Sequence, residues 1–240
     1  MNIAIILAGG SGTRIKSEIP KQFLKINGKR IIEYSLQVFE QHPFIDEIAV
    51  VIPVFYIKET KSIVAHKGYK KVQKVIAGGM ERYHSCWEAI QMYENYPQAN
   101  VLIHDAARPW VDANTISEVL DALNTYNAVS VAIPATDTIY YMDNHFIQQI
   151  PNRKYTMRAQ TPQGFKQYLL QNAYKQAIQE KTLEATDDCG VVLKYFPNEP
   201  IFVVQGSERN IKITHQEDIL LFKTSVGGHN PNVVVRSNVF

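Results

Sequence analysis

Short apolar runs alternate with amphipathic stretches along the first half of the chain. The runs are nearly free of polar residues, as in strands buried on both faces of a parallel sheet. They lie at residues 3–7, 48–52, 74–77, 101–104 and 128–134. Between them, apolar residues recur at helical spacing and predict helices over residues 31–41, 56–66, 81–94 and 113–125, the last capped by Asn114 or Thr115. This alternation predicts a doubly wound, mostly parallel, Rossmann-like α/β sheet.

The alternation of strand and helix patterns stops over residues 136–160. Residues 138–141 and 146–150 predict two strands around a turn at 142–145, a β-hairpin inserted into the α/β domain as a projecting arm. The later patterns are a helical one over 165–179, apolar segments at 203–206 and 211–214, and the start of a last helix at 217–222. We therefore expect a single domain over residues 1–225 with an arm at about 136–160, followed by an irregular tail at 226–240.

Composition narrows the class of protein. The 240 residues include 25 basic and 23 acidic side chains, for a net charge of +2, so nothing drives general binding to nucleic acid. Cys86 and Cys189 are too few for a disulfide framework or a four-ligand zinc site. No apolar run approaches the roughly 20 residues that span a membrane, and the N-terminus lacks a signal-peptide pattern. We expect a cytoplasmic protein with no nucleic-acid or membrane partner.

Three glycine-rich or polar segments, residues 8–14, 78–85 and 104–108, each follow a predicted strand. Ligands bind beyond the carboxyl ends of such strands, so we expect the segments to converge on one site. In the first, successive backbone N–H groups could cradle a phosphate, with Arg14 and Lys21 adding positive charge. The segment has neither the P-loop ending nor the dinucleotide Gly-x-Gly-x-x-Gly spacing. A tight turn without a ligand is the alternative interpretation.

A carboxylate follows the fourth predicted strand, where Asp105 lies beside His104 and Arg108. A nucleoside triphosphate bound beside it would bring Mg²⁺, which takes one or two protein carboxylates, so Asp105 is a candidate metal ligand. The alternative is a capping carboxylate paired with Arg108. His104 is expected to be a hydrogen-bonded structural residue.

These segments, together with several later ones, resemble the signature of the nucleotidylyltransferases. The similarity is to the branch that contains methylerythritol-phosphate cytidylyltransferase and ribitol-5-phosphate cytidylyltransferase. His-Asp-Ala-Ala-Arg-Pro combined with Gln-Thr-Pro-Gln is far more specific than any single motif. The matching residues are 8–14, 20–23, 78–82 with Ser85, 104–109, 137–138, Arg153, 160–163, 186–187 and 210–214.

The resemblance implies a nucleotide-diphospho-sugar transferase type of fold and the transfer of CMP from CTP to a polyol phosphate, with Mg²⁺ as cofactor. It assigns catalytic contacts with the phosphates to Arg14, Lys21 and Lys212. It assigns CTP binding to Leu7, Ala8, Gly9, Gly10, Gly12, Thr13, Gly79, Arg82 and Ser85. It places Asp105, Thr138, Arg153, Thr161 and Thr186 around the acceptor. In the family, the residues matching Thr138 and Arg153 come from the arm of a second subunit, which implies a homodimer with exchanged arms.

The acceptor is less well determined than the reaction. The Leu-Ala-Gly-Gly opening, the Ile-Pro-Asn-Arg at residues 150–153 and the segment 186–190 favour ribitol 5-phosphate. The spacing from Arg14 to Lys21 instead matches the methylerythritol type. Met80 concerns the nucleotide and not the acceptor: it stands where relatives often carry a polar or acidic residue, which leaves one side-chain contact to the nucleotide unassigned. Outside this branch, the alternatives are a hexose-1-phosphate nucleotidylyltransferase and a non-catalytic nucleotide-binding domain.

Overall fold

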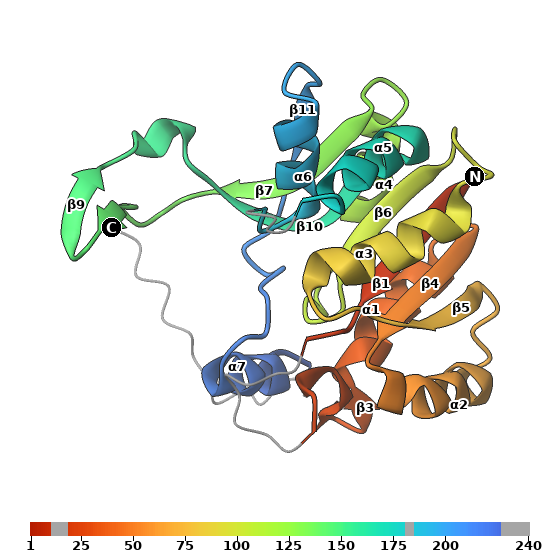
Figure 1. Ribbon diagram of the computed structural model, residues 1–240. Coiled ribbons are helices and arrows are strands. Elements are labelled where there is room, and N and C mark those ends of the chain that lie inside the picture. Colours follow the sequence, from red (N-terminus) through yellow and green to blue (C-terminus); the bar gives the residue numbers. More distant parts are fainter. Residues whose placement is uncertain (11–18, 181–184, 227–240) are drawn as a thin grey trace.

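The computed structural model describes residues 1–10, 19–180 and 185–226. The strands of its main sheet are β1 (Asn2–Leu7), β4 (Glu47–Ile52), β5 (Val72–Ala77), β6 (Asn100–Asp105), β7 (Ala128–Pro134), β10 (Met157–Lys166) and β11 (Ile201–Gln205). They form a seven-stranded sheet in the order β11-β7-β10-β6-β1-β4-β5 (Figure 1). Only β10 runs antiparallel to its neighbours, β6 and β7. The predicted mostly parallel sheet is confirmed.

Helices cover both faces of this sheet. They are α1 (Ile31–Gln41), α2 (Ile57–Lys67), α3 (Arg82–Ile90), α4 (Ala113–Ala122), α5 (Gln167–Ala177) and α6 (Asp188–Tyr195), whereas α7 (Gln216–Val226) packs elsewhere. Strand β1 shows why its residues 3–7 are all apolar. Ala4 and Ile6 belong to a core with residues of α1, α2 and α4, whereas Ile3 and Ile5 belong to a second core with residues of α3, α5 and α6. In a strand buried on both faces, the side chains on both sides contact a core and are therefore apolar.

Several boundaries differ from the sequence-based expectation. The cap of α4 is Asp112, whose side chain accepts from the Thr115 N–H, and neither Asn114 nor Thr115. The helix expected from residue 165 begins at Gln167, because Phe165 lies in β10 and fills the second core. Strand β10 was not predicted, since its Gln and Thr residues break the apolar pattern. The expected helix over 81–94 is α3 followed by a 3-10 helix, η4 (Gln91–Tyr93).

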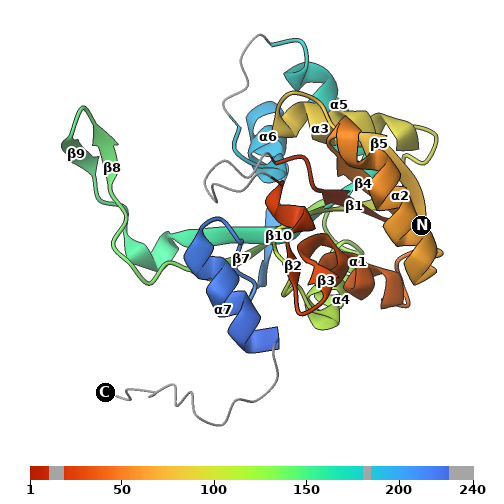
Figure 2. The same ribbon diagram turned by 90° about the horizontal axis from the view of Figure 1, so that it is seen from below.

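A hairpin projects from the sheet between β7 and β10, as the sequence predicts (Figures 1 and 2). Its strands, β8 (Tyr141–Asp143) and β9 (Phe146–Gln149), are shorter than expected. The turn lies at Asn144 and His145, whose φ angles of 42° and 70° suit a tight hairpin turn. All of residues 136–150 are exposed. The chain returns to the sheet through η5 (Arg153–Tyr155).

Helix α7 lies on a small separate core. Its Phe222 packs with Ile26, Ile31 and Ile213, next to the two-stranded β2 (Lys25–Ile26) and β3 (Lys29–Arg30). Two further 3-10 helices are η2 (Lys21–Phe23) and η3 (Val54–Tyr56). The expected tail lies outside the described residues, apart from Val226.

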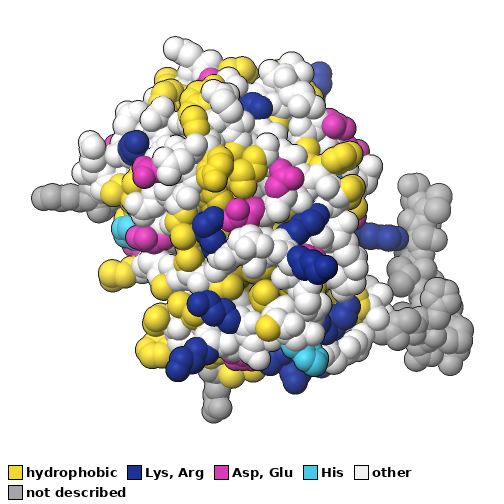
Figure 3. Space-filling model, turned by 90° about the vertical axis from the view of Figure 1, so that its right-hand side faces the viewer, with side chains coloured by type: hydrophobic (Ala, Val, Ile, Leu, Met, Phe, Trp, Pro, Cys, Tyr) yellow, Lys and Arg dark blue, Asp and Glu magenta, His cyan; other side chains and the backbone are white. Residues whose placement is uncertain are grey.

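Figure 3 shows one face of the molecule, on which Lys and Arg side chains are interspersed with acidic and apolar ones. Among the described residues, no helix is both long and apolar enough to cross a membrane.

Candidate active site

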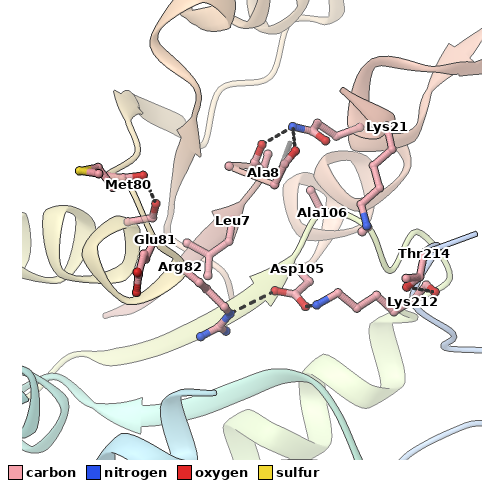
Figure 4. Close-up of a pocket in the computed structure, with 16 residues that line it drawn as sticks. Leu7, Ala8, Lys21, Met80, Glu81, Arg82, Asp105, Ala106, Lys212 and Thr214 are labelled. Atoms are coloured by element: carbon pink, nitrogen blue, oxygen red, sulfur yellow. Dashed lines mark hydrogen bonds and ion pairs between the residues drawn. The ribbon is translucent and has the colours of Figure 1, made fainter. Parts of the chain in front are cut away.

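A pocket of about 360 Å³ opens beyond the carboxyl ends of β1, β5 and β6 (Figure 4). The three segments that follow these strands all contribute to it, as the sequence predicts. Lys212 and Thr214 approach from the segment between β11 and α7. The lining residues are Leu7, Ala8, Gly9, Gly10, Lys21, Gln22, Gly79, Met80, Glu81, Arg82, Ser85, Asp105, Ala106, Ala107, Lys212 and Thr214.

Gly79 lets the segment after β5 fold tightly against the start of α3. A Cβ at this position would lie 2.3 Å from the Cβ of His84 and 3.2 Å from its backbone carbon. No side chain fits into that space without moving the backbone. The glycine therefore brings the backbone of this segment close to Ser85 and to the rim of the pocket.

Asp105 lies between two cations. Lys212 Nζ is 2.6 Å from Asp105 Oδ2, and Arg82 Nε is 3.7 Å from Asp105 Oδ1 (Figure 4). Burial by itself would raise the pKa of Asp105, but attraction to Lys212 and Arg82 and the hydrogen bond from Lys212 outweigh it. The pKa of the carboxyl is held well below its usual range, so Asp105 is ionised.

The 3-10 helix η2 brings a second amine to the pocket. Lys21 Nζ donates to the carbonyl of Ile213 at 2.7 Å. The neighbouring Gln22 is buried, and its amide donates to the carbonyls of Ala8 and Gly10, the latter at 3.2 Å. Gln22 thereby fixes η2 against the glycine segment. Lys21 and Lys212 thus reach the same pocket from different parts of the chain.

Thr161 lies behind Asp105 and is part of a buried hydrogen-bond chain. Its Oγ1 accepts from the Asp105 N–H at 3.2 Å and is 3.0 Å from His104 Nδ1. His104 Nε2 is 3.1 Å from the carbonyl of Arg108, so Nε2 carries the proton and Nδ1 accepts from the Thr161 hydroxyl. Burial lowers the pKa of His104 to about 4. As expected from the sequence, His104 is buried and hydrogen-bonded, and it is neutral.

Hydrogen bonds hold the segment that carries Lys212 and the residues next to it. Arg108 Nη1 donates to the Asn210 carbonyl at 2.8 Å, and Asn210 Nδ2 donates to the Thr161 carbonyl at 2.9 Å. The Ile213 N–H donates to the Ala107 carbonyl at 2.8 Å. The Arg108 guanidinium thus donates to backbone carbonyls. The ion-pair partners of Asp105 are Lys212 and Arg82. The side-chain ion pair between Asp105 and Arg108 that the alternative interpretation assumed is not formed, although the Arg108 N–H donates to the Asp105 carbonyl at 2.9 Å in a turn.

The residues expected around the acceptor do not all meet within one chain. Of the five, only Asp105 lines the pocket. Thr138 and Arg153 are exposed on the arm, where Arg153 Nη1 donates to the Thr136 carbonyl at 3.1 Å. Thr186 is exposed just before Asp187, the cap of α6.

The expected nucleotide and phosphate residues lie mostly in the pocket. Leu7, Ala8, Gly9, Gly10, Lys21, Gly79, Arg82, Ser85 and Lys212 all line it. Gly12, Thr13 and Arg14 lie outside the described residues.

Sequence reasoning missed several residues at the site. Gln22 and Thr214 line the pocket and belong to motifs that match the family, so these motifs could have identified both as site residues. Asp188 follows the matching Thr186 and Asp187, and its Oδ2 lies 2.6 Å from Arg82 Nη2. Nothing in the sequence pairs these two residues, which are far apart along the chain.

The thiols take no part in this arrangement. Cys86 is buried in the second core, Cys189 is half-buried, and both are free cysteines. Burial raises the pKa of both thiols well above the usual value. Neither has the character of a nucleophile.

Comparisons with known proteins agree with the fold and the motifs. The chain matches the sequence model of the family described as IspD, 2-C-methyl-D-erythritol 4-phosphate cytidylyltransferase, over residues 2–227. It is 40% identical over 222 residues to the protein of that name from Thermobifida fusca, covering 90% of this chain and 89% of the relative. It is 42% identical over 223 residues to a bifunctional ribulose 5-phosphate reductase/CDP-ribitol pyrophosphorylase from Haemophilus influenzae, covering 92% of this chain and 47% of that protein.

Solved structures give the same result. The crystal structure of 4-diphosphocytidyl-2C-methyl-D-erythritol synthase from Anaerococcus prevotii superposes with a TM-score of 0.82 at 30% identity, covering 94% of this chain and 96% of that one. That of 2-C-methyl-D-erythritol 4-phosphate cytidylyltransferase from Francisella tularensis gives 0.76 at 27% identity, covering 94% and 99%. The family resemblance seen in the motifs is confirmed, and the chain belongs to the 2-C-methyl-D-erythritol 4-phosphate cytidylyltransferase (IspD) family of nucleotidyltransferases.

Proposed function

We propose that this enzyme transfers CMP from CTP to a polyol phosphate, forms a CDP-alditol and releases pyrophosphate. The observation that carries the proposal is the ionised Asp105 held between Lys212 and Arg82, with Lys21 reaching the same pocket. Two lysines, an arginine and one carboxylate in the same pocket suit a triphosphate with its cation. The names of the relatives supply the nucleotide, CTP, and the class of acceptor.

The reaction we propose is an in-line displacement. An oxygen of the acceptor phosphate forms a bond to the α-phosphorus of CTP, and the bond from that phosphorus to the bridging oxygen breaks, so pyrophosphate leaves with both electrons. Little proton transfer is needed, so positioning and charge neutralisation supply most of the acceleration. Lys21, Lys212 and Arg14 would stabilise the charge on the phosphates. Gly79, Arg82 and Ser85 would surround the nucleoside.

We also propose that the reaction uses Mg²⁺. The described residues contain no cluster of three or more His, Cys, Asp or Glu side chains that could hold a metal alone. Mg²⁺ bound with a nucleotide takes most of its ligands from phosphate and water and needs only one or two carboxylates. The ionised Asp105 in the pocket fits that requirement and would hold the ion. The ion would neutralise charge on the phosphates.

For the acceptor, we propose ribitol 5-phosphate first and 2-C-methyl-D-erythritol 4-phosphate as the alternative. The Haemophilus influenzae relative supports the first and the Thermobifida fusca relative the second. We further propose a homodimer in which Thr138 and Arg153 of one subunit's arm complete the pocket of the other. The exposure of both residues on a projecting hairpin supports this arrangement.

Pyrophosphate release tests the reaction directly. The protein is incubated with Mg²⁺, CTP and either of the two polyol phosphates, and UTP or GTP replaces CTP as the control. We expect release with CTP and one acceptor, which identifies the substrate. Release with neither acceptor, together with measurable binding of CTP, would direct the search to other polyol phosphates. Failure of CTP to bind would contradict the proposal.

A further inference from the structure

A buried carboxylate lies directly behind the pocket. Asp188, the first residue of α6, has no exposed surface. Its Oδ2 accepts from Arg82 Nη2 at 2.6 Å, and its Oδ1 accepts from the Tyr174 hydroxyl at 2.6 Å. Asp188 does not line the pocket, whereas Arg82 does. We propose that Asp188 is a positioning residue, which acts on the reaction by fixing the guanidinium of Arg82 beside Asp105.

The charges form an alternating row across the site. Lys212, Asp105, Arg82 and Asp188 follow one another, with N···O distances of 2.6, 3.7 and 2.6 Å. The guanidinium is a rigid plane, so anchoring Nη2 on Asp188 also limits where Nε points. Nε is the atom that faces Asp105. Asp188 therefore influences the orientation of the pocket carboxylate through a single intervening side chain.

Asp188 is itself held in place from several sides. Its backbone N–H donates to Gln163 Oε1 at 3.1 Å, and Tyr174 binds it from α5. The adjacent Asp187 caps α6 and also accepts from Gln163 Nε2 at 2.7 Å. These contacts make the location of the Asp188 carboxylate independent of what occupies the pocket.

A charge at this buried position is costly for a purely structural role. Removing a carboxylate from water carries a large penalty, and a neutral side chain could join α5 to α6 equally well. The pair with Arg82 offsets the penalty, and Arg82 is the only partner of Asp188 described here that reaches the pocket. We conclude that the charge serves the site and not only the packing of the helices.

The experiment rests on the proposed function and uses Asp188→Asn as the main variant. Asparagine keeps the shape of the side chain and can still bond both neighbours, but it lacks the charge. We expect kcat/KM for pyrophosphate release to fall about ten- to a hundred-fold, the scale of a small misplacement of a catalytic group. Arg82→Gln should have a similar effect, and the double variant should be no slower than Arg82→Gln alone. Mg²⁺-CTP affinity is measured on the same set.

Tyr174→Phe is the matched control, because it removes the bond on the structural side of the same carboxylate. We expect it to lower the melting temperature and to reduce kcat/KM less than Asp188→Asn does, because the contacts of Asp188 with Arg82 and Gln163 remain. Arg82→Lys, which keeps a charge but loses the planar fork, provides a second test if Asp188→Asn does not fold.

The outcomes separate the two proposals. If wild type releases pyrophosphate and Asp188→Asn is equally fast, only the role of Asp188 is overturned. If the losses from Asp188→Asn and Arg82→Gln multiply in the double variant, Asp188 acts independently of Arg82 and the inference is also wrong. If wild type releases no pyrophosphate, the proposed function has failed. The same double-variant comparison of Mg²⁺-CTP affinities then decides the inference.

Discussion

At the scale of single residues, His104 and Asp105 are adjacent yet lie in opposite electrostatic surroundings. Burial lowers the pKa of His104 from 6.5 to about 4. Between these values the unfolded chain binds a proton that the folded chain does not, so stability falls as the pH drops through this window. The loss should approach about 3 kcal/mol, at 1.36 kcal/mol per pKa unit.

The His104→Gln variant tests this window. Its free energy of unfolding, measured with denaturant at pH 7 and pH 4.5, should change less between the two values than that of wild type. Asp105 contributes to the free energy of unfolding above its usual pKa of 3.8. This contribution is lost only below that pH, because the pKa of Asp105 in the folded protein is depressed. The two residues therefore act in different pH ranges. An unchanged pH dependence in the variant would contradict a buried, neutral His104.

Asp105 and Lys212 are the residues on which catalysis should depend most. We expect Lys212→Ala and Asp105→Asn each to lower kcat/KM about 10²- to 10³-fold, as when a charge-stabilising contact is removed from a transition state. Steady-state pyrophosphate release gives the measurement. Lys175→Ala, which changes an exposed lysine on α5, is the control and should keep wild-type activity. Normal turnover in Lys212→Ala would remove this residue from the proposed mechanism.

At the scale of elements, β10 is packed tightly against α4 at Gly164. A Cβ there would lie 2.6 Å from Val119 Cγ1 and 3.0 Å from Leu123 Cδ1. We expect Gly164→Ala to cost about 1–3 kcal/mol, as for other overpacked cores. Denaturant unfolding measures the loss. Val119→Ala makes room, so the double variant should lose less than the sum of the two single changes. A strictly additive result would mean that the clash is relieved elsewhere.

The same strand shows what the sequence could and could not predict. Strands and helices with apolar faces were predictable, because burial leaves a pattern, and so was the convergence of segments that follow parallel strands. Strand β10 left no such pattern, because Gln160, Thr161 and Gln163 point their polar groups at other segments. Gln160 donates to the Ser207 carbonyl at 2.8 Å and Gln163 to Asp187 at 2.7 Å. Partners so far apart along the chain are fixed only by the folded structure.

At the scale of the whole molecule, the arm is an element whose apolar side chains are not covered by other described parts of its own chain. Its apolar side chains are exposed, among them Tyr141 at 58% and Phe146 at 71%. A two-stranded hairpin alone is marginally stable in water. Contact with a second copy of the chain would cover these side chains and bring Arg153 to the partner's pocket.

Subunit mixing tests this arrangement. Lys212→Ala disables a pocket and Arg153→Ala disables an arm, so each variant alone should be nearly inactive. After subunit exchange, each mixed dimer would have one intact site, and activity should recover to about a quarter of wild type for random pairing of two-fold dimers. A mixture of Lys212→Ala with Asp105→Asn has no intact pocket and should stay inactive. Absence of recovery in the first mixture would contradict shared sites.

The wall of the pocket that carries Lys212 lies outside the sheet. Residues 207–214 form no strand and are held by hydrogen bonds that involve Arg108, Asn210 and Ile213. A segment held by a few hydrogen bonds opens locally at lower free energy than a central sheet. Its amide hydrogens should therefore exchange with solvent before those of β1. Such opening would separate Lys212 from Asp105, so this one segment would change the balance of charge in the pocket while the sheet stays intact.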